Sequence, residues 1–242
     1  MSVNVITLKE KSQFVCGGVQ AELLLPSGEN RPKRLLTLLH GAAETPETIL
    51  NNFDLLKASE RLHLAILLPA LGNSFYLDWG EGKNARSSLL LEMLPAARTY
   101  SGISANRRYN AVGGISMGGF GALSLALSEP ARFSAAFSLS GALDLQKAAQ
   151  LFRICELPPP GDLCTAALRP ETKWDALLSQ KTAKPNLYLA WGDRDWFREA
   201  NRSFIRQAAE CGMAVKASET PGLHDWAYWQ SSLGPALEWT VP

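Results

Sequence analysis

Short apolar runs recur along the whole chain, separated by segments in which apolar residues return with a helical period. Runs of this length that are rich in leucine, valine and alanine are typical of strands buried on both faces of a sheet. None reaches the roughly 18 apolar residues that a membrane span requires. We therefore expect strands at residues 34–40, 64–69, 109–115, 135–140, 186–191 and 213–218.

The alternation of strand and helix patterns predicts an α/β fold with a mostly parallel central sheet and helices on both faces. Two earlier strands, Val3 to Leu8 and Phe14 to Leu25, are expected to pair as a meander with a bend or bulge at Gly17-Gly18. The polar segment 26–32 is predicted to be a turn before the first long strand.

The length of 242 residues is ordinary for one α/β sheet enzyme, so we expect a single domain over residues 1–242. The segment 143–184 contains three consecutive prolines and lacks a clean strand pattern. It is expected to form a short, lid-like helical excursion over the top of the sheet, too short to be a separate domain.

One motif gives the chain a candidate chemistry. The sequence Gly114-Ile115-Ser116-Met117-Gly118 lies between an apolar run and a small-residue helical pattern over 117–128. This is the order of a tight strand-to-helix turn that holds a serine hydroxyl above a sheet as a nucleophile. Glycine would be costly inside an ordinary helix, about 1 kcal/mol against alanine, so the glycines in its first turns indicate close approach of other backbone. The motif predicts a serine hydrolase with Ser116 as its nucleophile.

A serine nucleophile needs a base, which is usually histidine. The chain has three histidines, and His40 and His63 both precede the serine. In enzymes built on this kind of turn the chain order is serine, acid, histidine, which leaves His224 as the candidate base.

The acid should follow a strand that lies between the serine and the histidine. Residues 186–191 are such a strand, and Gly192-Asp193-Arg194-Asp195 comes directly after it. Asp193 and Asp195 therefore compete for the role, and either could instead cap the helix predicted to begin near Phe197. Asp144, Asp162 and Asp175 follow no strand pattern and are expected to be solvated.

Ester cleavage also needs two N–H groups directed at the oxyanion of the tetrahedral intermediate. One comes from the residue after the nucleophile, Met117, and the other from a loop after an earlier strand that often carries a His-Gly pair. The sequence Leu38-Leu39-His40-Gly41-Ala42 fits that loop, so Ala42 and Met117 are the candidate donors.

Taken together, these blocks resemble the esterase family that includes esterase D, S-formylglutathione hydrolases, tributyrin esterases and the more distant antigen 85 mycolyltransferases, within the α/β-hydrolase superfamily. The likeness covers residues 34 to 237 in family order. It is carried by the residues 38–41 (LLHG), 74–78 (SFYLD), 114–122 (GISMGGFGA), 138–141 (SLSG), 191–195 (WGDRD) and 222–226 (GLHDW).

The resemblance implies an α/β-hydrolase fold and an ester or thioester hydrolase that needs no metal and no organic cofactor. Its Gly-x-x-Asp acid motif ends on Asp195, which favours Asp195 over Asp193 as the acid. Family members often have more glycine after the His-Gly pair, whereas Ala42 and Ala43 follow here. The oxyanion loop is therefore expected to differ in shape. The family pattern also suggests Tyr76 and Asp78 at the rim of the active site.

Aromatic residues gather around these motifs in the sequence and could form the walls of a small acyl pocket or belong to the core. We list His40, Tyr76 and Trp226 as candidate substrate contacts, although His40 also suits a structural role in holding its loop.

Charge and cysteine content restrict the expected partners and location of the protein. The 24 basic and 23 acidic residues give a net charge of +1, so neither nucleic acid nor a membrane surface is an expected partner. The expected partner is a small acyl ester or thioester, and a homo-oligomer is compatible with the sequence. Cysteines 16, 155, 164 and 211 lack metal-site spacing and are expected to be isolated buried thiols, with a 155–164 disulfide as the alternative. The first residues show no export signal, so a cytoplasmic location is expected.

Three functions remain open. The first is a carboxylesterase acting on short acyl esters, including acylated sugars. The second is a thioesterase of the S-formylglutathione type, or an acyltransferase, with the same mechanism. The third is a binding protein that has kept the fold and lost the chemistry.

Overall fold

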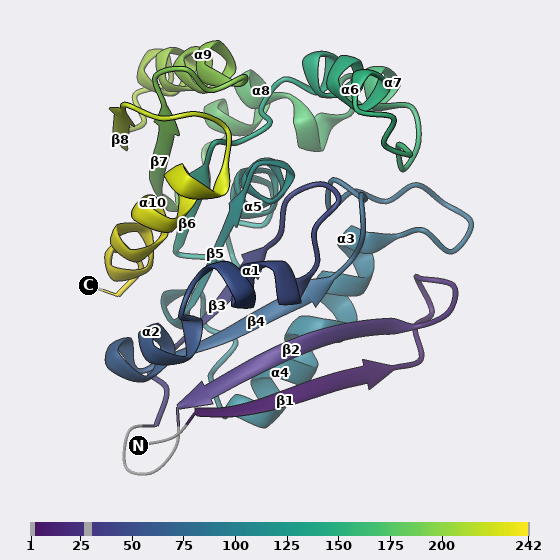
Figure 1. Cartoon of the computed structure of the whole chain (residues 1–242), viewed down its shortest axis with the longest axis vertical. Coiled ribbons are helices and arrows are strands. Elements are labelled where there is room, and N and C mark those ends of the chain that lie inside the picture. The colour runs from purple at the N-terminus through teal and green to yellow at the C-terminus, as the bar shows by residue number, and fades with distance from the viewer. Residues whose placement is uncertain (1–2, 27–30, 242) are drawn as a thin grey trace.

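An eight-stranded sheet runs through the centre of the molecule in the computed structural model, which describes residues 3–26 and 31–241 (Figure 1). Its strand order is β1-β2-β4-β3-β5-β6-β7-β8. The strands are β1 (Val3–Glu10), β2 (Val19–Pro26), β3 (Arg34–Leu39), β4 (Leu64–Ala70), β5 (Asn110–Ile115), β6 (Ala135–Leu139), β7 (Asn186–Gly192) and β8 (Val215–Thr220).

Only the first strands depart from a parallel arrangement. β1 pairs with β2, and β2 with β4, in antiparallel fashion, whereas every pair from β4 through β3 to β8 is parallel. The register pairs Leu39 with Gly114, Ile115 with Leu139, and Leu139 with Ala190. The carboxyl ends of β3, β5, β6 and β7 therefore meet at one edge, where ligand sites of α/β sheets form. The predicted mostly parallel α/β fold is confirmed.

Helices cover both faces of the sheet (Figure 1). One apolar core includes residues of α4, α5, α8 and α9, and the opposite core includes residues of α1, α2 and α10. The helices are α1 (Pro46–Asn52), α2 (Leu55–Leu62), α3 (Ala85–Ser88), the π-helical turn η1 (Leu89–Met93), α4 (Leu94–Ser101), the 3-10 turn η2 (Arg107–Tyr109), α5 (Met117–Ser128), α6 (Leu145–Ile154), α7 (Leu163–Ala166), the 3-10 turn η3 (Pro170–Thr172), α8 (Trp174–Ser179), α9 (Arg198–Glu210) and α10 (Trp226–Trp239).

The second strand is shorter than predicted. β2 begins at Val19 and not at Phe14, because Gly17 and Gly18 both adopt a φ of 85°, which turns the chain back toward β1. A side chain at position 18 would lie 2.6 Å from the Glu10 carbonyl oxygen, so the turn requires glycine there. The predicted polar turn over 26–32 lies largely outside the described residues.

The segment between β6 and β7 contains α6, α7, η3 and α8, without a strand, as its pattern indicates. Trp174 at the start of α8 packs against Phe120 of α5 and Phe204 of α9, with ring centroids 5.4 and 5.3 Å apart. The indole N–H of Trp174 also donates to the Leu143 carbonyl at 2.9 Å. These contacts attach the segment to the helices beneath it.

The cysteines do not follow the prediction. All four thiols, at positions 16, 155, 164 and 211, are free and exposed, so neither the buried environment nor the 155–164 disulfide is present. The sites lie in loops and at helix ends, where the apolar pattern gives no guide to exposure.

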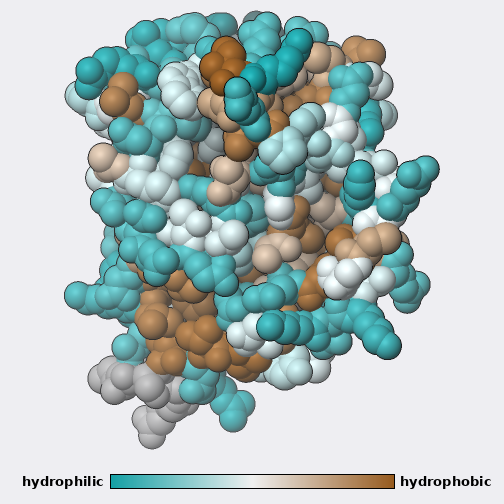
Figure 2. Space-filling view, turned by 45° about the vertical axis from the view of Figure 1, so that its right-hand side comes forward, coloured by the Kyte–Doolittle hydropathy of each residue, from teal (hydrophilic) through white to brown (hydrophobic). Residues whose placement is uncertain are grey.

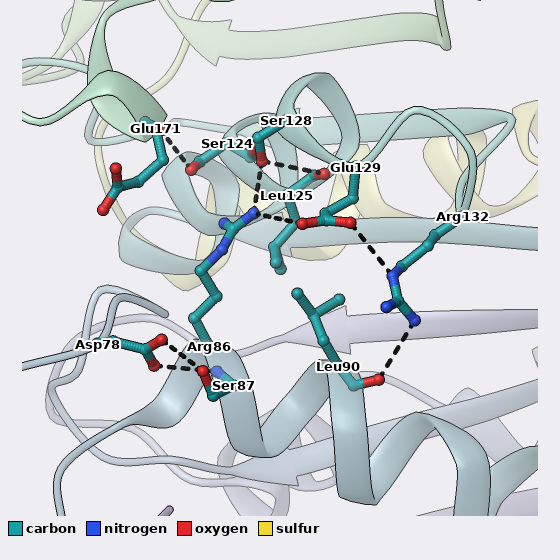
Figure 3. Close-up of polar contacts among 10 residues, drawn as sticks. All are labelled: Asp78, Arg86, Ser87, Leu90, Ser124, Leu125, Ser128, Glu129, Arg132 and Glu171. Atoms are coloured by element: carbon teal, nitrogen blue, oxygen red, sulfur yellow. Dashed lines mark hydrogen bonds and ion pairs between the residues drawn. The ribbon is translucent and has the colours of Figure 1, made fainter.

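A network of ion pairs and hydrogen bonds anchors the far end of α5 (Figure 3). Arg86 of α3 donates to the Ser128 hydroxyl at 2.6 Å and to the Glu129 carboxylate at 3.4 Å. Arg132 bonds the same carboxylate at 3.2 Å and the Leu90 carbonyl at 3.4 Å. Cations are favoured at the carboxyl end of a helix, where its dipole is negative. The network therefore holds α5 in place along its axis.

The face drawn in Figure 2 is largely hydrophilic, with apolar side chains reaching the surface in separate patches. No helix within the described ranges has both the length and the apolar character needed to cross a bilayer.

Candidate active site

Ser116 occupies a strained turn between β5 and α5. Its φ is 55° and its ψ is −115°, a combination that side-chain-bearing residues rarely adopt. The turn is closed tightly, because a Cβ atom at Gly114 would lie 2.3 Å from the Gly118 carbonyl carbon, and one at Gly118 would lie 2.1 Å from the Leu39 carbonyl oxygen. Glycine at both positions lets α5 begin directly beneath the end of β3, which leaves the serine at the carboxyl edge of the sheet.

His224 and Asp195 reach this serine from separate loops. The Nε2 atom of His224 lies 2.9 Å from Ser116 Oγ. The Nδ1 atom lies 3.0 and 3.1 Å from the two carboxylate oxygens of Asp195. The structure thus brings together the three side chains expected from the sequence. Ser116 and His224 meet although they are 108 positions apart in the chain.

The surroundings of Asp195 favour its ionised form. The residue is 6% exposed, and burial alone would raise its pKa. Hydrogen bonds from the His224 ring, the Ser140 hydroxyl and the Phe197 N–H outweigh burial and hold the pKa below its ordinary value. The Phe197 N–H donates to Oδ1 at 2.7 Å. The carboxylate is therefore fixed in orientation and ready to balance a positive imidazolium.

Aromatic rings enclose the imidazole of His224. Trp196 stacks on it with centroids 5.1 Å apart and an interplanar angle of 16°, and Phe197 lies at 5.5 Å. Trp229 meets it edge-on at 5.1 Å and donates through its indole N–H to the Ser140 hydroxyl at 3.0 Å. These contacts limit rotation of the ring and exclude water from it.

Asp193, the competing acid, lies elsewhere. Its Oδ1 accepts from the Gly222 N–H at 3.1 Å, and its own N–H donates to the Thr220 carbonyl. It therefore shapes the loop before His224 without touching the imidazole's Nδ1. Among the aspartates expected to be solvated, residues 144, 162 and 175 are all exposed, and the first two cap α6 and α7.

In the loop after β3, the N–H groups on either side of Ala42 are hydrogen-bonded. The Gly41 N–H donates to Glu44 Oε2 at 2.7 Å, and the Ala43 N–H donates to Asn73 Oδ1 at 2.7 Å. Within the described residues no acceptor is recorded for the N–H of Ala42 or of Met117. Ala42 and Met117 both line the same pocket as Ser116. Both candidate oxyanion donors are therefore available to a ligand.

His40, Tyr76 and Trp226 support this loop, and none is among the described residues that line the pocket. The His40 ring is buried, its Nδ1 lies 2.7 Å from the Gly41 carbonyl, and burial lowers its pKa. The Tyr76 hydroxyl donates to the His40 carbonyl at 2.9 Å. Trp226 donates to Glu44 at 2.8 Å. Each of the three is turned toward protein partners in this structure, and a role in contacting substrate stays a prediction.

A cavity of about 230 Å³ opens beside Ser116. Its walls are largely apolar, and α6 supplies three of the side chains. The lining residues are Gly41, Ala42, Glu44, Phe75, Ser116, Met117, Ala142, Ala148, Leu151, Phe152, Cys155, Leu157, Trp196, Phe197, His224 and Trp229.

Several of these were not identified from the sequence. Leu151 and Phe152 belong to the segment expected to lie over the sheet, and the helical pattern there does not indicate which side faces a pocket. Glu44 is the first charged residue after the His-Gly pair, a signal that could have drawn attention to it. Ser140, in the 138–141 block, reaches Asp195 through its side chain.

The chain matches a known protein family and a curated relative. Residues 17–240 match the family described as "Putative esterase". The chain is 30% identical over 220 residues to an acetyl esterase of Caldicellulosiruptor saccharolyticus, an alignment that covers 85% of this chain and 82% of that protein.

Solved structures share the fold. The S-formylglutathione hydrolase FrmB of Staphylococcus aureus superposes with a TM-score of 0.85 at 22% identity, covering 99% of both chains. MPT51 of Mycobacterium tuberculosis gives 0.80 at 18% identity, covering 98% of both. The family resemblance seen in the sequence is confirmed: the chain belongs to the Putative esterase family and is a serine hydrolase with an α/β-hydrolase fold.

Proposed function

We propose that the protein is a carboxylesterase that hydrolyses esters of short acyl groups through an acyl-enzyme on Ser116. The observation that carries the proposal is the continuous contact from Ser116 Oγ to His224 Nε2 at 2.9 Å and from His224 Nδ1 to Asp195 at 3.0 Å. This is the arrangement in which an imidazole can take the serine proton while a buried carboxylate orients it.

In the first half of the reaction, Ser116 Oγ attacks the ester carbonyl carbon and its proton passes to His224 Nε2. Asp195 keeps the other ring proton on Nδ1 and stabilises the imidazolium. The carbonyl oxygen becomes an oxyanion that accepts from the Ala42 and Met117 N–H groups. His224 then gives its proton to the alcohol oxygen as the ester C–O bond breaks, and the alcohol leaves.

In the second half, water attacks the acyl-serine carbonyl. His224 removes a proton from the water, the oxyanion forms again at the same two N–H groups, and the proton returns to Ser116 Oγ as the carboxylic acid departs. The rings around the imidazole hold it in one position for both proton transfers.

The size of the pocket supports a short acyl group. A cavity of about 230 Å³ is smaller than the roughly 300 Å³ at which pockets for drug-sized ligands begin. Its wall, which is apolar apart from Glu44 and the catalytic residues, suits an alkyl chain. The relative from Caldicellulosiruptor saccharolyticus, named an acetyl esterase, supports the same size class.

A fluorophosphonate probe tests the site directly. We expect the wild-type protein to be labelled at Ser116, and Ser116→Ala to be unlabelled, folded and slower in kcat on p-nitrophenyl acetate by about 10⁵ to 10⁶. Peptide mapping locates the label, and thermal denaturation checks the fold. Labelling at another residue, or a variant that keeps most of its activity, would contradict the proposal.

The same machinery would process a thioester or pass the acyl group to an acceptor alcohol. A panel of p-nitrophenyl esters, S-formylglutathione and sugar alcohols as acceptors distinguishes these reactions by kcat/KM. We expect the short esters to give the highest values.

A further inference from the structure

Glu44 places a negative charge in the wall of an otherwise apolar pocket. Its Oε2 accepts from the Gly41 N–H at 2.7 Å, and its Oε1 accepts from the Trp226 indole at 2.8 Å. Both oxygens accept from N–H donors, an arrangement that favours the ionised carboxylate. Burial raises the pKa of Glu44 above its ordinary value, and these two hydrogen bonds and the nearby His224 offset only part of that rise.

No cation offsets this charge within the pocket. Among the described residues that line it, none is lysine or arginine. Two arginines directly follow lining residues in the sequence, and both bond other groups. Arg153 bonds the Ala149 carbonyl at 3.3 Å within α6, and Arg198 bonds the Glu219 carboxylate at 2.9 Å.

Aromatic side chains make up much of the remaining wall. The pocket is lined by Phe75, Phe152, Trp196, Phe197 and Trp229. The face of an aromatic ring is electronegative and attracts ammonium groups, most strongly when water is excluded. A carboxylate among aromatic rings is therefore a favourable environment for a cation and an unfavourable one for an anion.

We propose that Glu44 makes this pocket select its esters by charge, accepting ammonium-bearing esters over neutral ones of the same shape and rejecting anionic ones. This inference rests on the proposed esterase function and narrows its substrate class to neutral and cationic esters. The Glu44 carboxylate and a charged group of the ester would interact over several ångströms at a partly buried site. This interaction should change kcat/KM by about tenfold per unit of substrate charge.

The test uses three acetate esters of similar shape, formed with choline, 3,3-dimethylbutanol and 2-hydroxyethanesulfonate. A second series carries the charge on the acyl side, as p-nitrophenyl pentanoate and the p-nitrophenyl monoester of glutarate. Hydrolysis is followed in a pH-stat at pH 8 and low salt. We expect kcat/KM of the choline ester to exceed that of the sulfonate ester by on the order of 100-fold, and the neutral acyl ester to exceed its anionic partner by about tenfold.

Glu44→Gln should reduce both ratios to a few-fold, because it keeps one acceptor oxygen and removes the charge. Comparing ratios within each variant cancels any uniform loss caused by loosening the loop. Glu47→Gln is the matched control: this exposed glutamate on α1 is not among the lining residues, and its loss should leave both ratios unchanged.

A second variant keeps the test valid if Glu44→Gln does not fold. Cys155 is exposed and lines the pocket, so Cys155→Lys adds a cation there with little risk to the core, and Cys155→Gln is its neutral control. The lysine should lower the preference for the choline ester. If wild type hydrolyses all esters of both series equally while Ser116→Ala is inactive, charge selection is wrong and the esterase site stands. If Ser116→Ala remains active, the proposed function itself fails.

Discussion

Replacing Asp195 with asparagine removes the negative charge of the buried acid and keeps the size and shape of its side chain. The Phe197 N–H lies 2.7 Å from Oδ1 and requires an acceptor, so the amide oxygen of the variant should occupy that place. The amide nitrogen then replaces Oδ2, 3.0 Å from His224 Nδ1. The amide oxygen would lie 3.1 Å from Nδ1, but a proton kept on Nδ1 would clash with the N–H groups of the amide nitrogen at 3.0 Å. We therefore expect Nδ1 to accept from the amide and the ring proton to move to Nε2. The imidazole would then donate to Ser116 and could not take its proton.

The expected loss of kcat follows from the free energy needed to return the imidazole to the tautomer that carries its proton on Nδ1. Turning the amide over leaves the buried Phe197 N–H facing another donor, at a cost of about 1–3 kcal/mol. The imidazolium also loses a charged hydrogen-bond partner, which costs about 1.5–3 kcal/mol more. Together these lower kcat by about 10² to 10⁴, while KM should change little because Asp195 does not line the pocket.

Steady-state kinetics on p-nitrophenyl acetate measure both constants, and thermal denaturation shows whether the variant is folded. Asp193→Asn is the matched control, because its amide oxygen can still accept from the Gly222 N–H, and kcat should fall by no more than a few-fold. A folded Asp195→Asn variant that keeps a tenth of wild-type kcat, or an equal loss in both variants, would refute the assignment of the acid.

Three further outcomes are expected. Gly118→Ala places a Cβ 2.1 Å from the Leu39 carbonyl oxygen, so unfolding free energy should fall by about 3 kcal/mol and activity should be lost, whereas Gly234→Ala, with nothing nearer than 3.9 Å, should be stable in the same denaturation assay. Leu151→Ala removes part of the pocket wall and should raise the hexanoate-to-acetate ratio of kcat/KM about tenfold, and an unchanged ratio would place the acyl chain elsewhere. Glu219 has its pKa lowered to about 2 from 4.5, chiefly by a hydrogen bond from an arginine, so it stabilises the fold above pH 4.5 and loses this as pH falls toward about 2. Glu219→Gln should therefore unfold about 1–2 kcal/mol more easily at pH 7 yet match wild type in acid, and parallel stability curves would contradict this.

Local pattern was sufficient where one short segment decides the structure. The helix predicted over 117–128 has those bounds in the structure, because the Gly-Ser turn defines its start and Glu129 follows its last residue. The strands predicted at 34–40 and 186–191 end within one residue of the observed β3 and β7. A strand that is buried on both faces of a sheet is apolar along its whole length, so an apolar run directly marks its bounds.

Long-range contacts could not be read in this way. Glu44 meets Trp226, 182 positions away, and nothing near either residue in the sequence signals the partner. The inward turn of His40 and Tyr76 depends on the same loop geometry. The exposure of the cysteines likewise depends on which loop surfaces remain uncovered, a property of the assembled fold.

Every residue of α5 from 117 to 127 is buried, so this helix has no solvent side. A surface helix can exchange half of its positions at little cost, whereas here each replacement must fit a filled space. Variation in selectivity is therefore expected to accumulate around the nucleophile and not beneath it, in α6 and in the loop after β3. Libraries that aim at new substrates should be restricted to those two segments, with the central helix left intact.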